Sequence, residues 1–220
     1  MLAVELIADV VPPVHTSDSI QKVIDRMYEF RVKHLPIVNE DQFLGLVAED
    51  DLIRETDYST QIGALRLSLV NPYVLAEQHV YDVIRLFHEQ QLTVVPVLDT
   101  KSNYLGLISI NAITEYFATL TSVEQPGGII VLEIINKNNS LAHMSQIVES
   151  DNAQILSSYV RSFPDSTKME VTLKVNKQDI SAIVASFLRY DYEIKATFNH
   201  TQENDNSRER YNSFMNYLNL

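Results

Sequence analysis

The chain has 220 residues, 45% of them hydrophobic and 21% charged, which is ample for a sizeable core and ordinary for a globular protein. Its formal net charge of −12 argues against the basic surface that binding to nucleic acid requires. It has no cysteine, which excludes disulfide frameworks, thiolate metal sites and cysteine nucleophiles. The N-terminus is not typical of a signal peptide, and no apolar run reaches the roughly 18 to 20 residues that span a bilayer. We therefore expect a cytoplasmic protein with no membrane contact.

The N-terminal stretch predicts a short helix, an extended piece and a longer amphipathic helix. The short helix is expected to end near Asp9, because Pro12-Pro13 cannot continue it and favours an extended chain over residues 10–14. Asp18 followed by Gln21 predicts a capping box at the start of the longer helix. The apolar face of that helix comprises Ile20, Val23, Ile24, Met27 and Phe30.

Two apolar strands and a closing helix follow, and the whole β-α-β-β-α unit then recurs. The first copy has predicted strands at 35–38 and 43–48 and a helix at 49–55. A polar connector at 57–60 and a short helix at 61–65 precede the second copy. Its elements are predicted at 80–87, 94–98, 104–109 and 110–120. A repeated unit too small to close a core alone implies that the two copies pack together.

The segment Gln125-Pro126-Gly127-Gly128 is the clearest domain boundary in the sequence. Beyond it the order of predicted elements is βαββαβ. The strands are expected at 129–135, 154–160, 169–175 and 194–198, and the helices at 141–148 and 180–188. This order predicts a ferredoxin-like sandwich, an antiparallel sheet with two helices on one face.

The last 22 residues are a polar stretch, 199–207, and a segment with one apolar face. In residues 208–220, Tyr211, Phe214, Met215 and Leu218 share one side of a helix. We expect this helix to pack back on its own domain. The alternative is that it docks on a neighbouring subunit or on a partner protein.

Two marks of the repeat resemble the CBS domain, the module named after cystathionine β-synthase. One is an apolar-Pro-apolar strand, Leu35-Pro36-Ile37 and Val95-Pro96-Val97. The other is an apolar-Gly-apolar strand that enters a helix, Leu44-Gly45-Leu46-Val47 and Leu105-Gly106-Leu107-Ile108. The resemblance covers about residues 6–55 and 66–117, and it rests on both marks occurring twice in the same order.

The resemblance implies a Bateman module, a tandem CBS pair with a cleft that binds AMP, ADP, ATP or S-adenosylmethionine and regulates an attached or partner protein. Residues 129–198 resemble an ACT-like domain, which binds an amino acid or serves for dimerisation. The combined architecture is similar to that of acetoin-utilisation regulatory proteins. The fold class is therefore α+β, with CBS motif 1 at 1–60, CBS motif 2 at 61–124, the ACT-like domain at 128–200 and a tail with an amphipathic helix at 201–220.

The adenosine-binding signature of the family, Ser/Thr-x-x-Asp, is split between the two copies. The first copy keeps the carboxylate as Asp51 in Ala48-Glu49-Asp50-Asp51, and the second keeps the hydroxyl as Ser109. The other reading is that Asp51 merely stabilises a helix N-terminus and Ser109 caps a helix. By resemblance, the candidate ligand-binding residues are Val14, Thr16, His34, Leu35, Pro36, Asp51, Thr93, Val94, Pro96 and Ser109.

No catalytic motif occurs, and five glycines in the whole chain leave little scope for a phosphate-binding glycine loop. We expect a non-enzymatic sensor with no catalytic residue, no metal site and no required cofactor beyond a regulatory adenosine ligand. It would act as a homodimer and on a regulated protein partner. The alternative is a CBS-ACT scaffold that has lost its ligand and acts through protein contacts alone.

Overall fold

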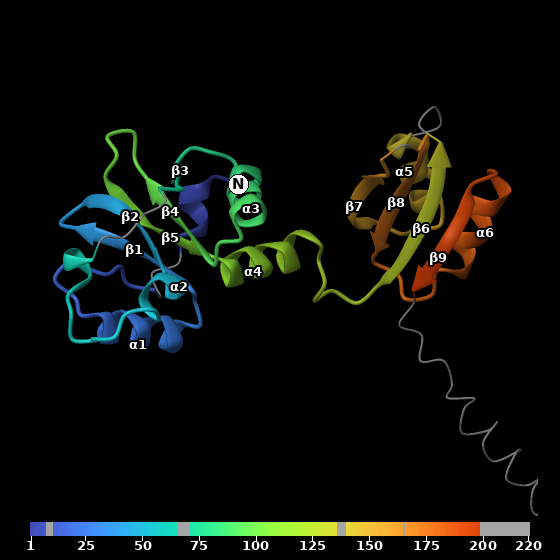
Figure 1. Ribbon diagram of the computed structural model, residues 1–220. Helices are drawn as coiled ribbons and strands as arrows, with labels where there is room; N and C mark the ends of the chain where they lie inside the picture. The colour runs from blue at the N-terminus through green and yellow to red at the C-terminus, as the bar shows by residue number, and fades with distance from the viewer. Residues whose placement is uncertain (8–10, 66–70, 136–139, 165, 199–220) are drawn as a thin grey trace, which may run out of the picture. The chain divides into compact units, whose positions relative to one another are not determined.

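The computed structural model describes residues 1–7, 11–65, 71–135, 140–164 and 166–198. The chain divides into two compact units, Met1–Phe117 and Ala118–Leu220 (Figure 1). Among the described residues, no helix is both long enough and apolar enough to cross a membrane. The predicted end of the first helix at Asp9 and the predicted helix at 208–220 lie outside the described residues.

The first unit contains the two copies of the β-α-β-β-α motif, as predicted. Copy 1 consists of α1 (Ile20–Phe30), β1 (His34–Asn39), β2 (Gln42–Ala48) and α2 (Glu49–Leu52). A 3-10 helix lies in the segment before each copy, η1 (Ala3–Leu6) before copy 1 and η2 (Ile62–Ala64) before copy 2. Copy 2 consists of β3 (Val74–Leu75), α3 (Val80–Gln90), β4 (Val94–Leu98), β5 (Tyr104–Ser109) and α4 (Ile110–Leu120). Two helices differ in length from the prediction: α2 ends at Leu52 rather than near residue 55, and α3 continues to Gln90 rather than ending at residue 87.

The strands pair in the same way in both copies. In copy 1, β1 and β2 are antiparallel, and Val14 forms a parallel bridge with Ile37. In copy 2, β4 and β5 are antiparallel, and β3 pairs in parallel with β4, Val74 lying opposite Val97. The two parallel pairings are sixty residues apart in the sequence. The repeat seen in the sequence is therefore a repeat of structure.

A single hydrophobic core serves both copies. Ile20 and Leu35 from copy 1 lie in the same cluster of buried residues as Val95 and Leu107 from copy 2, and each is at most 1% exposed. Because burial of apolar surface is the main favourable term in folding, each copy depends on the other for a closed core.

The segment that precedes each copy packs on the other copy, which the sequence did not reveal. At the N-terminus, the Ala3 N–H donates to the Gln78 carbonyl at 2.8 Å, and the Val80 N–H donates to the Met1 carbonyl at 3.2 Å. The connector makes the equivalent contacts with copy 1. There the Ile62 N–H donates to the Asp18 carbonyl at 2.9 Å.

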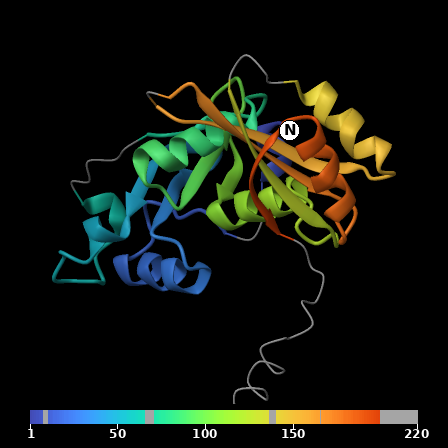
Figure 2. The same cartoon turned by 90° about the vertical axis from the view of Figure 1, so that its right-hand side faces the viewer.

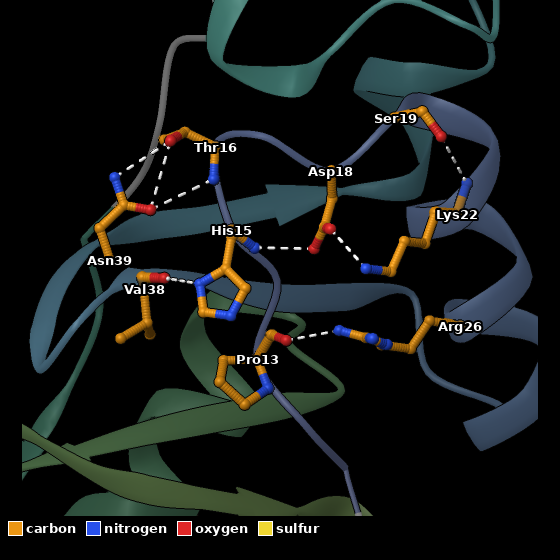
Figure 3. A network of polar contacts seen from close by, with 9 residues as sticks. All are labelled: Pro13, His15, Thr16, Asp18, Ser19, Lys22, Arg26, Val38 and Asn39. Atoms are coloured by element: carbon orange, nitrogen blue, oxygen red, sulfur yellow. Dashed lines mark hydrogen bonds and ion pairs between the residues drawn. The ribbon is translucent and has the colours of Figure 1, made fainter.

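The predicted capping box at Asp18 and Gln21 is wrong, because the cap lies one residue later. The Ser19 hydroxyl accepts the N–H of Lys22 at the start of α1, at 3.3 Å. Asp18 instead accepts the His15 N–H at 2.9 Å and the Lys22 ammonium at 2.6 Å (Figure 3). These bonds hold the pKa of this buried carboxyl below its usual value against the opposing effect of desolvation.

The second unit has the predicted ferredoxin-like topology. Its elements are β6 (Gly128–Ile135), α5 (Leu141–Ser150), β7 (Ile155–Ser162), β8 (Lys168–Val175), α6 (Ser181–Arg189) and β9 (Glu193–Phe198). The strand order is β7-β8-β6-β9, and every neighbouring pair is antiparallel. Figure 2 shows α5 and α6 on the same side of this sheet.

Alternation along the strands decides which face of this sheet is covered. Leu132 and Leu173, with no exposed surface, point to the helices and share a core with Phe187 of α6. Thr172 and Lys174 alternate with these positions on β8 and lie on the opposite face. The confirmed fold class is therefore α+β, a tandem repeat pair followed by a ferredoxin-like sandwich.

Candidate ligand-binding site

The apolar members of the predicted site are part of the strands and of the core. Val14, Leu35 and Val94 have no exposed surface, and Pro36 and Pro96 are also buried. Val14 is fixed on both sides, because its N–H donates to the Pro36 carbonyl at 2.9 Å and its carbonyl accepts the Val38 N–H at 2.8 Å. These residues position the strand ends that carry the polar candidates.

His34 and Thr93 are hydrogen-bonded to each other and join the two copies. Nδ1 of His34 lies 3.1 Å from the Thr93 hydroxyl oxygen, and the Thr93 N–H donates to the same nitrogen at 3.3 Å. The Thr93 hydroxyl oxygen also accepts the Lys33 N–H at 2.9 Å. Two residues predicted separately as ligand contacts thus form one polar junction between β1 and the residue just before β4.

These contacts fix the tautomer of His34. A hydroxyl oxygen that accepts the Lys33 N–H can still donate its own proton, and Nδ1 then accepts from both the Thr93 hydroxyl and the Thr93 N–H. The neutral ring therefore carries its proton on Nε2. Burial lowers the pKa of His34 below its usual value, although the charges of Asp50 and Asp51 oppose that shift.

Asp51 lies at the start of α2, on the same side of the unit as His34. The Glu49 N–H donates to the Lys33 carbonyl at 2.9 Å, which ties the first turn of α2 to the chain beside His34. Asp51 is exposed, and one of its carboxylate oxygens accepts the Ala48 N–H at 3.3 Å. Because its charge acts on His34, the structure brings Asp51, His34 and Thr93 into one neighbourhood.

Ser109 is the helix cap that the second reading of its sequence position predicts. It is 9% exposed, and its hydroxyl accepts the Ala112 N–H in the first turn of α4 at 3.2 Å. The Ile110 N–H donates to the Thr93 carbonyl at 3.2 Å, the counterpart of the bond between Glu49 and Lys33 in copy 1. The equivalence of the two copies therefore extends to the start of the closing helix.

Thr16 lies at the other end of β1 from His34, because its partner Asn39 is the last residue of that strand. Figure 3 shows the hydrogen bonds between Thr16 and Asn39. The Asn39 amide group donates to the Thr16 hydroxyl at 3.0 Å, and its oxygen accepts the Thr16 N–H at 3.3 Å. In the same network, Nδ1 of His15 donates to the Val38 carbonyl at 2.6 Å. Asn39 was not a predicted site residue. The only feature of the sequence that could have suggested its contact with Thr16 is its position at the end of a predicted strand.

The comparisons with known proteins agree with the repeat. The CBS-domain family matches this chain twice, over residues 4–57 and 69–119. A CBS domain pair/ACT domain protein from Thermotoga maritima is 22% identical, with a TM-score of 0.48 over 53% of this chain and 96% of that one. CBSX2 in complex with AMP is 17% identical, with a TM-score of 0.47 over 56% of this chain and 98% of that one.

The CBS domains of a transcriptional regulator from Streptococcus pneumoniae are 18% identical, with a TM-score of 0.47 over 52% of this chain and 98% of that one. The similarity to acetoin-utilisation regulators and the predicted domain boundaries stay predictions. The family matches coincide with the two structural copies, which share one core and place equivalent residues at equivalent bonds. The chain therefore belongs to the CBS-domain proteins and carries two CBS domains in tandem.

Proposed function

We propose that the CBS pair binds an adenosine-containing ligand, AMP, ADP, ATP or S-adenosylmethionine, beside Asp51, and that the protein is a regulatory sensor without catalytic activity. The observation that carries this proposal is the polar junction of His34 with Thr93 next to the first turn of α2. It unites groups from both copies, so a ligand bound there would respond to their relative arrangement. The family resemblance supplies the class of ligand.

Each polar group of this neighbourhood has a role that suits an adenosine ligand. A carboxylate has about four acceptor positions, and the bond with Ala48 uses one of those of Asp51. Asp51 can therefore accept hydrogen bonds from both ribose hydroxyls. The Nε2–H of neutral His34 is a donor for an adenine nitrogen or a phosphate oxygen, and the exposed Lys33 adds a positive charge that attracts phosphate.

The proposal includes a homodimer and a regulated protein partner. Its support is the exposed apolar surface of copy 2, where Leu105 is 44% and Ile110 is 42% exposed. A ligand that favours one arrangement of the two copies over another would change this surface and hence the affinity for a partner. Amino-acid binding and dimerisation are both open roles for the ACT-like domain.

The test is a thermal-shift titration of the full chain with AMP, ADP, ATP and S-adenosylmethionine. A ligand at 100 times its dissociation constant stabilises the folded state by about 2.7 kcal/mol. Asp51→Asn should remove most of that stabilisation. The matched control is Asp50→Asn, which removes the same charge from the neighbouring position in α2 and should retain most of it. Equal losses in both variants would mean that only the charge near the site matters, and the assignment of Asp51 to the ribose would be wrong.

A second candidate is a scaffold that acts through protein contacts alone. It is favoured by the hydroxyls of Thr16, Thr93 and Ser109, which are all hydrogen-bonded within the protein. If the unaltered chain shows no shift with any of the four ligands at millimolar concentration, the sensor proposal fails. The scaffold then becomes the better explanation.

A further inference from the structure

The helix-free face of the second unit has an apolar end and a charged end. At the charged end, Lys168 pairs with Glu133 and Lys195 pairs with Glu170. The next pair on this face, two residues before Glu133 on β6 and two residues after Glu170 on β8, has uncharged side chains. The register sets Val131 beside Thr172 and Ala196, and then Ile129 beside Lys174 and Phe198. The side chains of Ile129, Val131 and Phe198 thus gather at the end of the sheet where β6 begins and β9 ends, where the Lys174 ammonium donates to the Ser122 carbonyl. At the charged end the apolar side chain on this face of β6 is Ile135, which is 53% exposed beside Lys168.

A segment of the same unit turns this end of the face into a cavity. The Ser157 hydroxyl donates to the Thr121 carbonyl at 3.1 Å, and the Lys174 ammonium donates to the Ser122 carbonyl. These bonds hold the segment 121–127 along the sheet as a wall. The space between has a volume of about 540 Å³, within the range of about 300 to 1,000 Å³ that proteins use to bind ligands. Its lining includes Val123, Pro126, Ile129, Tyr159, Thr172 and Phe198.

Two aromatic side chains that line this cavity are more than half exposed. Tyr159 is 55% exposed and Phe198 is 60% exposed. Val123, on the wall, is 59% exposed. Exposed apolar side chains gathered around a cavity mark a surface that another group covers.

The nearest chain available to cover it is the protein's own C-terminal segment. Phe198 lines the cavity, and the sequence continues from it for 22 residues. Nine of these, 199–207, can span about 30 Å when extended, whereas a sheet of four strands is about 14 Å across. The tether keeps residues 208–220 at an effective concentration near the millimolar range, which a free partner would have to exceed.

We propose that residues 208–220 bind this cavity as an amphipathic helix, with the side chains of Tyr211, Phe214, Met215 and Leu218 against the sheet. Their spacing of i, i+3, i+4 and i+7 makes one continuous apolar stripe on a helix. Thirteen residues of helix are about 20 Å long, which is enough to cross the four strands of the sheet, about 14 Å wide. The C-terminal segment then covers the end of the helix-free face where the cavity lies.

The absence of cysteine from the chain allows a direct test by disulfide trapping in the full-length protein. Thr172→Cys places a thiol in the lining of the cavity, and Met215→Cys places one in the apolar stripe. Under mild oxidation we expect this pair to form an intramolecular disulfide rapidly, because docking brings the two Cβ atoms within bonding range.

The matched control keeps Thr172→Cys and replaces Met215→Cys with Ser213→Cys. Position 213 lies on the opposite side of the helix from the stripe. Its tether to the sheet is two residues shorter than that of position 215, so a free tail would let it react at least as fast. When the helix is docked, the Ser213→Cys pair should react several times more slowly than the Met215→Cys pair.

A free C-terminal segment and a second copy of the chain would each give a different result in this experiment. Equal rates for the two pairs would show a free tether and overturn the proposal. A predominant disulfide-linked dimer on a non-reducing gel would overturn it too, because a second copy would then fill the cavity. Adding Phe214→Asp to the reactive pair should slow the disulfide to the control rate, and a retained cooperative unfolding transition of the second unit would show that its fold is intact.

Discussion

At the scale of single residues, Thr93 illustrates what a sequence conceals. Its hydroxyl oxygen accepts the Lys33 N–H, its own N–H donates to His34, and its carbonyl accepts the Ile110 N–H. The repeat aligns Thr93 with Lys33. The two are equivalent in the structure too, because the carbonyl of each accepts the N–H of the first residue of a closing helix, Glu49 for Lys33 and Ile110 for Thr93. The bond with His34 joins residues 59 positions apart, and no periodicity within one copy could predict it.

His34 should make the stability of the first unit depend on pH. Its pKa is lowered in the folded protein, chiefly by burial, from an ordinary value of 6.5. Below pH 6.5 the unfolded chain therefore binds a proton that the folded chain resists, and stability falls as pH falls through that value towards the folded pKa. The slope cannot exceed about 1.4 kcal/mol per pH unit for one proton. Urea denaturation between pH 5.5 and 7.5 measures it.

The control for this prediction is His34→Asn. An amide oxygen can replace Nδ1 as the acceptor for Thr93 but does not titrate in this range. The variant should lose the pH dependence while retaining most of the stability at pH 7.5. If the slope of the variant matches that of the unaltered protein, a different group is responsible.

At the scale of elements, the apolar patterns predicted strands and helices well because each element buries one face. The strands β4 and β5 begin and end at the residues predicted from sequence. The helix cap was missed by one residue, since Asp18 and Ser19 are both good caps and their tertiary partners decide between them. The exchange of leading segments between the copies was also missed, because it depends on contacts between distant parts of the chain.

The exchanged N-terminal segment makes Gly106 a sensitive position. Its φ is +153°, a backbone conformation that side chains disfavour, and a Cβ there would lie 2.5 Å from Cγ2 of Ile7. We expect Gly106→Ala to destabilise the first unit by about 1 to 3 kcal/mol, from backbone strain and from displacement of the segment that ends at Ile7. Chemical denaturation of the variant gives the value. In a double-mutant cycle, Ile7→Ala should recover the part due to the clash. Strict additivity would show that Ile7 is not the obstacle.

At the scale of the whole molecule, each unit has a core of its own. The buried cluster of the first unit and that of the second share no residue among those the structure describes. From the sequence, the change from the repeat to the period-two pattern of the sandwich predicted a second domain, with a boundary at Gln125–Gly128 that stays a prediction. The sequence could not predict the polar junction or the cavity on the sheet, because both arise from side chains that only the folded chain brings together.

Separate cores should give separate unfolding transitions. Phe187 has no exposed surface and packs edge-to-face with Tyr192 at a ring distance of 5.4 Å. Phe187→Ala should cost the second unit about 3 to 5 kcal/mol, through lost burial and the cavity left behind. The transition of the first unit should not move. Calorimetry measures both midpoints, and hydrogen exchange assigns each to its unit. Val95→Ala, at a position with no exposed surface in the first core, is the reciprocal control and should lower only the other transition. If either substitution shifts both transitions together, the two units unfold as one cooperative body, and the division drawn from their cores is wrong.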